Sequence, residues 1–333
     1  MPVEPLLEIS GLDVSFVTRN GILPAVRDVS LRIEAGEAIG LVGESGSGKT
    51  MTAMSIMRLL PGNCAVGGSV RFGGRNLLEL PERSLRQLRG SQIALVSQNA
   101  LVAFNPMVTV GHQITEQIRA HQKVSRQEAA DKAVALLEMT GLPDPRERFG
   151  QYPHEFSGGM LQRALIAMAL SCDPGLLVAD EPTTALDVSI QRQIVLLLDD
   201  LRRQLGMGLL LVTHDLGLLA GVVDRVYVMY AGRIVEEGPV EDIYYRPHHP
   251  YTQALLEAVP HTGGKAHQSL RPIPGLPVNA AEAPSGCAFR TRCTEAFDKC
   301  AEMPPWVQTS PGARSACWLA DPALLTTTGQ AAR

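Results

Sequence analysis

Eight consecutive residues, 43–50, constrain the fold of this chain more than any other part of its sequence. They read Gly-Glu-Ser-Gly-Ser-Gly-Lys-Thr and match the pattern G-x-x-x-x-G-K-[ST] in full. The apolar run at 38–42 just before them is typical of a strand buried on both faces, and a helix is predicted from about residue 50 to 60. A strand, a glycine-rich loop and a helix in this order predict a cradle of backbone N–H groups for a phosphate.

Each residue type in this loop has a physical reason to be there. The glycines allow the chain to curl, Lys49 can reach the β- and γ-phosphates of a nucleotide, and the Thr50 hydroxyl can bind Mg²⁺. The predicted nucleotide-binding residues of the loop are Gly43, Ser45, Gly46, Gly48, Lys49 and Thr50. Kinases, GTPases and helicases share such a loop, so it does not by itself identify the reaction.

The rest of the chain predicts an α/β fold. Residues 6–18 alternate apolar and polar side chains and residues 26–33 give a second strand signal, whereas short apolar runs at 176–179, 209–212 and 223–229 indicate buried strands. Helices are predicted at 82–90, 109–141 and 189–205. Buried strands that alternate with helices are typical of a core with a parallel sheet.

Two acids follow the apolar run at 176–179. Asp180 stands where a strand end can hold Mg²⁺, and Glu181 stands one residue further on, where its carboxylate can polarise a water as a general base. An exposed acidic turn is the alternative interpretation. The complete phosphate loop elsewhere in the chain favours the catalytic one.

A second anion-binding helix start is predicted at Ser157, Gly158 and Gly159, which precede a helical stretch at 164–170. Taken alone, this segment is more typical of an ordinary serine N-cap. Two phosphate-seeking helix starts in one chain cannot easily share one γ-phosphate. The sequence therefore predicts a head-to-tail dimer, in which the second start of each chain contacts the nucleotide of its partner.

These motifs, together with Gln98, Asp187 and His214, occur in an order and spacing that resemble those of an ABC (ATP-binding cassette) ATPase over residues 6–260. The resemblance implies a P-loop NTPase fold with a RecA-like core, an N-terminal antiparallel β part and an inserted helical subdomain at about 100–172. It also implies ATP and Mg²⁺ as ligands, and ATP hydrolysis coupled to the transport of a solute across a membrane.

The same resemblance assigns roles to single residues. Gln98 would sense Mg²⁺ and water and link hydrolysis to membrane subunits, and His214 would contact the γ-phosphate. Asp187 would couple the two nucleotide sites, and Phe16 would stack on adenine, although alone it is more typical of a core residue. The second helix start departs from the commonest family form, since Phe156 precedes it and Met160 follows it, but its Ser-Gly-Gly centre is intact.

A further block narrows the family. Residues 232–238 and 249–256 resemble the ATP-binding subunits of oligopeptide, dipeptide and nickel importers. From the residues alone, the His-Pro-Tyr-Thr run at 249–252 is only a helix start, with Thr252 as a possible cap. Import of di- or oligopeptides is the prediction. The alternatives are import of nickel or another small solute, an ABC exporter, a non-transport ABC ATPase and a degenerate regulatory ATPase.

Four of the six cysteines, Cys287, Cys293, Cys300 and Cys317, gather near the C-terminal end in the spacing C-x5-C-x6-C-x16-C. No C-x2-C pair is present, so the usual zinc-finger spacing is missing. Four thiolates can bind zinc or an iron–sulfur cluster. The resemblance to the C-terminal extension of the dipeptide-importer family implies a [4Fe–4S] cluster, with zinc, and free thiols or disulfides, as alternatives.

The predicted domains are a nucleotide-binding domain at 1–260 and an extension at 261–333, joined by a proline-rich connector at 271–284. The net charge of −4 gives no support for nucleic acid as a partner. No stretch is long and apolar enough to span a membrane. The resemblance to ABC importers implies, as partners, two membrane-spanning permease subunits, a second identical or related ATP-binding subunit and an extracytoplasmic solute-binding protein. The predicted location is peripheral, on the cytoplasmic face of the cell membrane.

Overall fold

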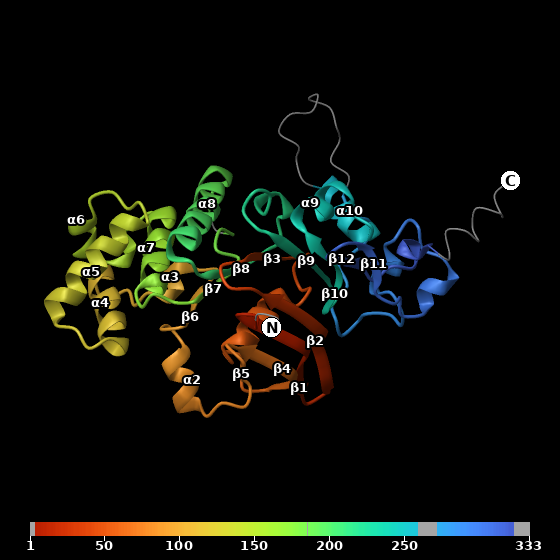
Figure 1. Ribbon diagram of the computed structural model, residues 1–333, viewed down its shortest axis with the longest axis horizontal. Coiled ribbons are helices and arrows are strands. Elements are labelled where there is room, and N and C mark those ends of the chain that lie inside the picture. The colour runs from red at the N-terminus through yellow and green to blue at the C-terminus, as the bar shows by residue number, and fades with distance from the viewer. Residues whose placement is uncertain (1–3, 185, 259–271, 323–333) are drawn as a thin grey trace, which may run out of the picture. The chain divides into compact units, whose positions relative to one another are not determined.

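The computed structural model describes residues 4–184, 186–258 and 272–322. The chain forms two compact units, each built from separate stretches of sequence. The first contains Met1–Leu7, Ile33–Ala38 and Arg71–Val212, and the second contains Glu8–Arg32, Ile39–Val70 and Thr213–Arg333, as far as these are described. Figure 1 labels their helices and strands. Over the described residues, none of the helices has the length and apolar character needed to cross a membrane.

Parallel strands form the centre of the first unit. β7 (Leu176–Asp180) lies between β6 (Ile93–Val96) and β8 (Gly208–Thr213), and every residue of β7 and β8 is buried. This confirms the strands predicted at 176–179 and 209–212. β6 is absent from the sequence prediction, because a run of four residues is too short to show a period.

Helices make up most of the remaining first unit. They are α2 (Glu82–Leu88), α3 (Ala100–Ala103), α4 (Val110–His121), α5 (Arg126–Met139), α6 (Pro145–Phe149), α7 (Gly158–Leu170) and α8 (Val188–Leu205), with a 3₁₀ turn at Pro153–Glu155 and the short strand β5 (Arg75–Asn76). The helices α3 to α7 fall within the range predicted for a helical subdomain, whose boundaries remain a prediction.

The prediction of one helical stretch over 109–141 is wrong, since two helices separated by residues 122–125 occupy it. Ser125 begins α5 with a capping box, in which its hydroxyl accepts a hydrogen bond from Glu128 N and its own N–H donates to Glu128 Oε2 at 2.8 Å. Apolar positions on both sides of the break keep a helical spacing, and this spacing conceals the break in the sequence.

The second unit contains the strand that leads into the glycine-rich loop. β3 (Ala38–Val42) pairs in parallel with β9 (Arg225–Tyr230), which pairs antiparallel with β10 (Arg233–Pro239). All five residues of β3 are buried, as its apolar run predicts. β1 (Leu7–Thr18), β2 (Gly21–Ile33) and β4 (Cys64–Phe72) belong to another sheet, in the order β2-β1-β4. Both units contain strands and helices, and parallel strands form the centre of the first, which confirms the predicted α/β core.

The helices in the described part of this unit are α1 (Lys49–Ile56), α9 (Val240–Tyr245) and α10 (Pro250–Glu257), with a 3₁₀ turn at Leu216–Leu218. α1 is shorter than the predicted helix at 50–60. Arg58 has a φ of 50°, in the left-handed region, and a residue with that backbone cannot continue a right-handed helix.

The described part of the C-terminal extension belongs to the second unit. Its strands β12 (Ala313–Ser315) and β11 (Val307–Ser310) add to β10, with Ser315 opposite Glu236. The 3₁₀ turns at Ala288–Thr291, Asp298–Ala301 and Trp318–Ala320 complete it, and residues 272–284 contain no helix or strand, as predicted for a connector. Figure 1 shows this segment in blue beside β10. Residue 271 of the predicted connector lies outside the described residues.

Candidate functional site

The phosphate loop, residues 43–50, connects β3 to α1. Lys49 is only 3% exposed, and its Nζ donates hydrogen bonds to Gly43 O at 2.8 Å and to Glu44 O at 3.0 Å. Gly48 occupies the N-cap position of α1, so a side chain does not cap this helix. The loop therefore combines a lysine ammonium with a helix start whose N–H groups are suited to an anionic ligand.

Two glycines are required by the close approach of other backbone to this loop. Gly48 has a φ of 105°, and a Cβ added there would lie 2.6 Å from Ala25 O. A Cβ on Gly43 would lie 2.1 Å from Met229 O. The structure places the other predicted loop residues at the surface, with Ser45 and Gly46 exposed and Thr50 half-buried in the first turn of α1.

The two acids predicted as a catalytic pair stand at the end of β7. Asp180 is the last residue of the strand and is buried, whereas Glu181 has a φ of 46° and is half-buried. This φ is uncommon for a residue with a side chain. Its N–H donates to Val212 O at 2.9 Å, which fixes the backbone where the carboxylate leaves the strand.

The structure brings Gln98 and Glu181 together. Glu181 Oε2 accepts a hydrogen bond from Gln98 Nε2 at 3.3 Å and another from Thr184 Oγ1 at 2.9 Å. Sequence reasoning missed Thr184, although the turn Asp-Glu-Pro-Thr-Thr places a hydroxyl three residues after the acid. The Glu181 carboxylate is thus oriented by two donors, as a positioned general base requires.

The second predicted helix start is real and lies at the surface. Ser157 is the N-cap of α7, its Oγ accepts a hydrogen bond from Met160 N at 3.4 Å, and Gly158 beside it is exposed. A Cβ on Gly158 would lie 3.2 Å from Leu186 Cδ2, and one on Gly159 would lie 3.0 Å from Ile190 Cγ2. The glycines therefore allow the start of α7 to approach the start of α8, where Asp187 is the exposed N-cap.

Two other predicted residues lie in the second unit, as the phosphate loop does. Phe16 is half-buried on β1, and His214 is exposed directly after β8. Their assigned contacts, with adenine and with the γ-phosphate, remain predictions.

The His-Pro-Tyr-Thr block has a structural role that its sequence did not reveal. His249 is the N-cap of α10 and its Nδ1 accepts a hydrogen bond from Tyr251 N at 3.0 Å, so the prediction of Thr252 as the cap is wrong. Burial lowers the pKa of His249 to about 3, and its imidazole is therefore neutral. Tyr251 OH accepts a hydrogen bond from Glu44 N at 2.8 Å. This block therefore contacts the phosphate loop.

The four clustered cysteines line one small cavity in the extension, with a volume of about 10 Å³. Burial, reinforced by the neighbouring thiols, raises the pKa of Cys317 to about 12, and burial also raises the pKa of Cys287 and Cys293. No disulfide joins the six cysteines, all of which are described. Among the described residues, no three His, Cys, Asp or Glu side chains are arranged to hold a single metal ion.

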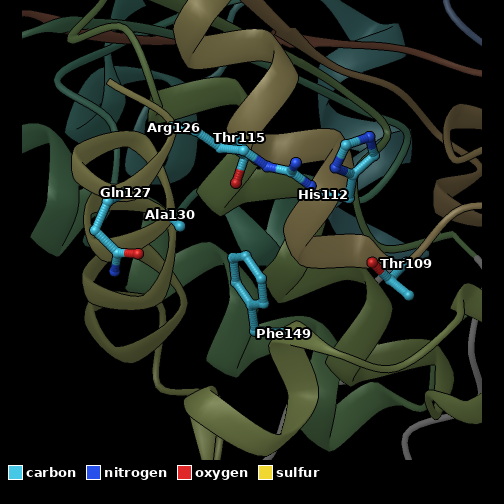
Figure 2. Close-up of a pocket in the computed structure, with 7 residues that line it drawn as sticks. All are labelled: Thr109, His112, Thr115, Arg126, Gln127, Ala130 and Phe149. Carbon is cyan, nitrogen blue, oxygen red and sulfur yellow. The ribbon is translucent and has the colours of Figure 1, made fainter. Parts of the chain in front are cut away.

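A larger hollow, of about 560 Å³, lies among the helices α4, α5 and α6 (Figure 2). Its lining residues are Thr109, His112, Thr115, Arg126, Gln127, Ala130 and Phe149. The ring of Phe149 packs so closely on Gly111 that a Cβ there would lie 2.2 Å from it.

Two stretches of the chain match models of known families. Residues 26–184 match the family model described as ABC transporter. Residues 235–300 match the model described as the C-terminal region of oligopeptide/dipeptide transporters.

The chain also resembles curated proteins along almost its full length. The oligopeptide transport ATP-binding protein OppD of Salmonella typhimurium is 47% identical over 317 residues, covering 95% of this chain and 94% of that protein. A probable peptide ABC transporter ATP-binding protein of Sinorhizobium fredii is 48% identical, with 94% of each chain covered.

Solved structures agree with this assignment. An ATP-binding cassette determined as a dimer in a post-hydrolysis state with ADP and phosphate has a TM-score of 0.63 and 26% identity, covering 70% of this chain and 98% of that one. These findings confirm the predicted fold class and the predicted ATPase activity. The chain belongs to the family of ABC transporter ATP-binding subunits, in the branch that carries the oligopeptide/dipeptide transporter C-terminal region.

Proposed function

We propose that this chain hydrolyses ATP to drive the import of di- or oligopeptides, as one of two ATP-binding subunits of a transporter. The observation that carries the proposal is the similarity to OppD over 94% of that protein, which includes the extension as well as the cassette. The proposed domains are the nucleotide-binding domain at 1–260 and the extension at 261–333. Nickel or another small solute is the alternative cargo, because related importers share the same ATPase design.

The phosphate loop is the proposed site of the ATP phosphates. Lys49 now donates to two loop carbonyls, and the same ammonium would exchange them for β- and γ-phosphate oxygens when ATP binds. Phe16 would stack on adenine, and His214 would contact the γ-phosphate. Mg²⁺, when bound, neutralises charge on the phosphate oxygens; Thr50, Asp180 and Gln98 are its proposed ligands.

Glu181 is the proposed general base. Two donors, on Gln98 and Thr184, orient its carboxylate, and it stands at a strand end with a backbone conformation that is held by Val212 O. A carboxylate so placed can take a proton from a water that attacks the γ-phosphate. Gln98 would also report the state of this carboxylate to the permease subunits, through the segment that follows it.

The surface of the first unit supports the proposed partners. Leu101, Val102 and Met107 follow Gln98 closely and are 56%, 79% and 81% exposed. We propose that they contact a membrane-spanning permease subunit. Val188, beside Asp187 and 80% exposed, supports contact of the α7 start with a second ATP-binding subunit. The proposed location is therefore peripheral, on the cytoplasmic face of the membrane, with a solute-binding protein on the other side.

The test is reconstitution of the chain with its native permease and solute-binding partners in lipid vesicles. Peptide import is expected to require ATP, and peptide is expected to stimulate ATP hydrolysis more than Ni²⁺ does. Stimulation and uptake with Ni²⁺ alone would reject peptide as the cargo. ATP hydrolysis that does not change when the permease subunits are added would reject the role as a transport subunit.

We further propose that Cys287, Cys293, Cys300 and Cys317 hold a [4Fe–4S] cluster, with zinc as the alternative. All four line the same cavity. Their thiolates would hold a cluster, and the same four sulfurs would be the ligands of zinc.

His249 fits this interpretation. Its Nδ1 accepts a hydrogen bond, so its proton is on Nε2, which is buried and has no partner within the described residues. His249 lines the same cavity as the cysteines, and this N–H could donate to a cluster or thiolate sulfur.

Iron and acid-labile sulfide measured on anaerobically purified protein test this proposal, together with visible absorbance. About four irons and four sulfides per chain are expected of such a cluster. Stoichiometric zinc without iron would reject the cluster in favour of zinc. A colourless, metal-free and fully folded protein would leave free thiols, or disulfides, as the state of the cysteines.

A further inference from the structure

We propose that Arg292 of the C-terminal extension is a positioning residue for the phosphate loop, because it pairs with Glu44 inside that loop. The inference rests on the proposed ATP site and adds a residue that lies outside all of its motifs. It gives the extension a part in nucleotide binding, through Glu44.

The contact is a two-pronged ion pair. Arg292 Nη1 donates to Glu44 Oε2 at 2.5 Å, and Arg292 Nη2 donates to Glu44 Oε1 at 3.0 Å. The planar guanidinium matches a carboxylate in this way, and a lysine ammonium does not. Only 3% of the Arg292 side chain is exposed, so solvent screens this pair far less than it screens a surface pair.

The guanidinium is fixed on its other sides too. Arg292 Nε donates to Pro274 O at 2.7 Å, and Nη1 also donates to Tyr230 OH at 3.3 Å. Pro274 belongs to the connector and Tyr230 to the end of β9. Because these bonds hold Arg292 in one orientation, Arg292 determines where the Glu44 carboxylate lies.

An aromatic cluster also connects the extension to Glu44. Phe289 lies with its ring centroid 5.3 Å from that of Tyr230 and 5.2 Å from that of Tyr251. Tyr251 is fully buried, and its hydroxyl accepts the hydrogen bond from Glu44 N. The backbone and the side chain of Glu44 are therefore both held by residues that meet at Phe289.

Charge explains why this pairing matters for ATP. Glu44 is the second residue of a loop that we assign to a triphosphate, and an unpaired carboxylate there would repel the ligand. Arg292 neutralises that carboxylate, so that the N–H groups of the loop and Lys49 determine the local charge. Loss of Arg292 should therefore weaken ATP binding, and removal of the Glu44 charge should restore it.

The experiment is a double-mutant cycle on the full chain, with titration of a non-hydrolysable ATP analogue and Mg²⁺. We expect Arg292→Met to raise the Kd about tenfold, Glu44→Gln to change it less than about threefold, and the double variant to recover most of the loss. A Kd for Arg292→Met equal to the wild-type value would overturn the proposal. So would a weakened Kd that Glu44→Gln fails to rescue.

Two further variants separate positioning from general loosening of the extension. Arg314 of the extension forms an ion pair with Glu237 at 2.9 Å, and this pair does not involve the phosphate loop. Arg314→Met breaks the pair and should leave the Kd for the ATP analogue unchanged. Arg292→Lys keeps the positive charge but loses the two-pronged pairing of the guanidinium, so the KM for ATP should rise about threefold at constant kcat. If Arg292→Met does not fold, an unchanged KM in Arg292→Lys refutes the proposal. Wild-type protein that binds no nucleotide would instead refute the ATP site itself.

Discussion

The N-terminal starts of α1 and α7 can both offer backbone N–H groups to a phosphate, but their surroundings differ. α1 begins at Lys49, which is buried under loop carbonyls, and has a glycine in place of a capping side chain. α7 begins after Ser157, whose own hydroxyl caps it, and it is exposed. The first start is enclosed by its own chain and carries its own cation. The second is presented outward, as expected of a surface that completes the site of another subunit.

The sharpest way to examine this contrast is to stop hydrolysis and keep the nucleotide in place. Glu181→Gln retains the hydrogen-bonding shape of the side chain and loses the base, so kcat should fall at least about 100-fold while ATP still binds. We also expect the variant to associate into dimers when ATP and Mg²⁺ are present, measured by light scattering. Wild-type turnover in this variant would remove Glu181 from its role.

Lys49→Ala tests the enclosed start alone. Hydrogen bonds to a charged partner contribute about 1.5–3 kcal/mol each, so the affinity of the isolated subunit for ATP should fall about 10- to 100-fold. Calorimetric titration measures this, and thermal unfolding without nucleotide serves as the control for folding. Equal affinities of variant and wild type would contradict the assignment of the loop.

Ser157→Asp tests the exposed start. Aspartate caps a helix about as well as serine, so the free energy of unfolding should change by less than about 0.5 kcal/mol. Its negative charge would oppose a phosphate, and ATP-dependent dimerisation and hydrolysis should fall about tenfold or more. ATP affinity of the isolated subunit should not change.

Ser157→Asn is the matched control, because it caps without charge and should retain more activity than the aspartate variant. If both variants hydrolyse ATP as the wild type does, the start of α7 does not face a phosphate.

The smallest expected effect concerns how tightly the starts of α7 and α1 are packed. Gly158→Ala meets only a leucine methyl group at 3.2 Å and should cost less than about 1 kcal/mol of stability. Gly48→Ala must adopt a positive φ against a carbonyl oxygen at 2.6 Å, and it should cost more than Gly158→Ala does. Urea denaturation of both variants measures the two losses of stability. A larger loss for Gly158→Ala than for Gly48→Ala would contradict the tighter packing around the start of α1.

Local features of this molecule were accessible from the sequence. Short sequence patterns predicted the phosphate loop, the strand and helix on either side of it, and the Ser157 cap, because each depends on neighbouring residues. Helix ends were less accessible. The end of α1 depends on the left-handed backbone of Arg58, and the cap of α10 depends on a histidine ring nitrogen that acts as an acceptor.

Contacts between distant residues were accessible only through resemblance or not at all. Gln98 and Glu181 are 83 positions apart, and only the family pattern suggested that they act together. Glu44 and Arg292 are 248 positions apart, and no local period or motif connects them. Such pairs depend on how the whole chain folds, which spacing along the sequence does not encode.

The pairing of β12 with β10 has a consequence for biosynthesis. A ribosome completes β10 long before it makes β12, so the nascent chain carries a bare strand edge until its last segment emerges. Bare edges invite pairing with other chains. Fragments that end before residue 307 should therefore aggregate during expression. The segment that contains β11 and β12 would protect the edge of β10 from pairing with other chains.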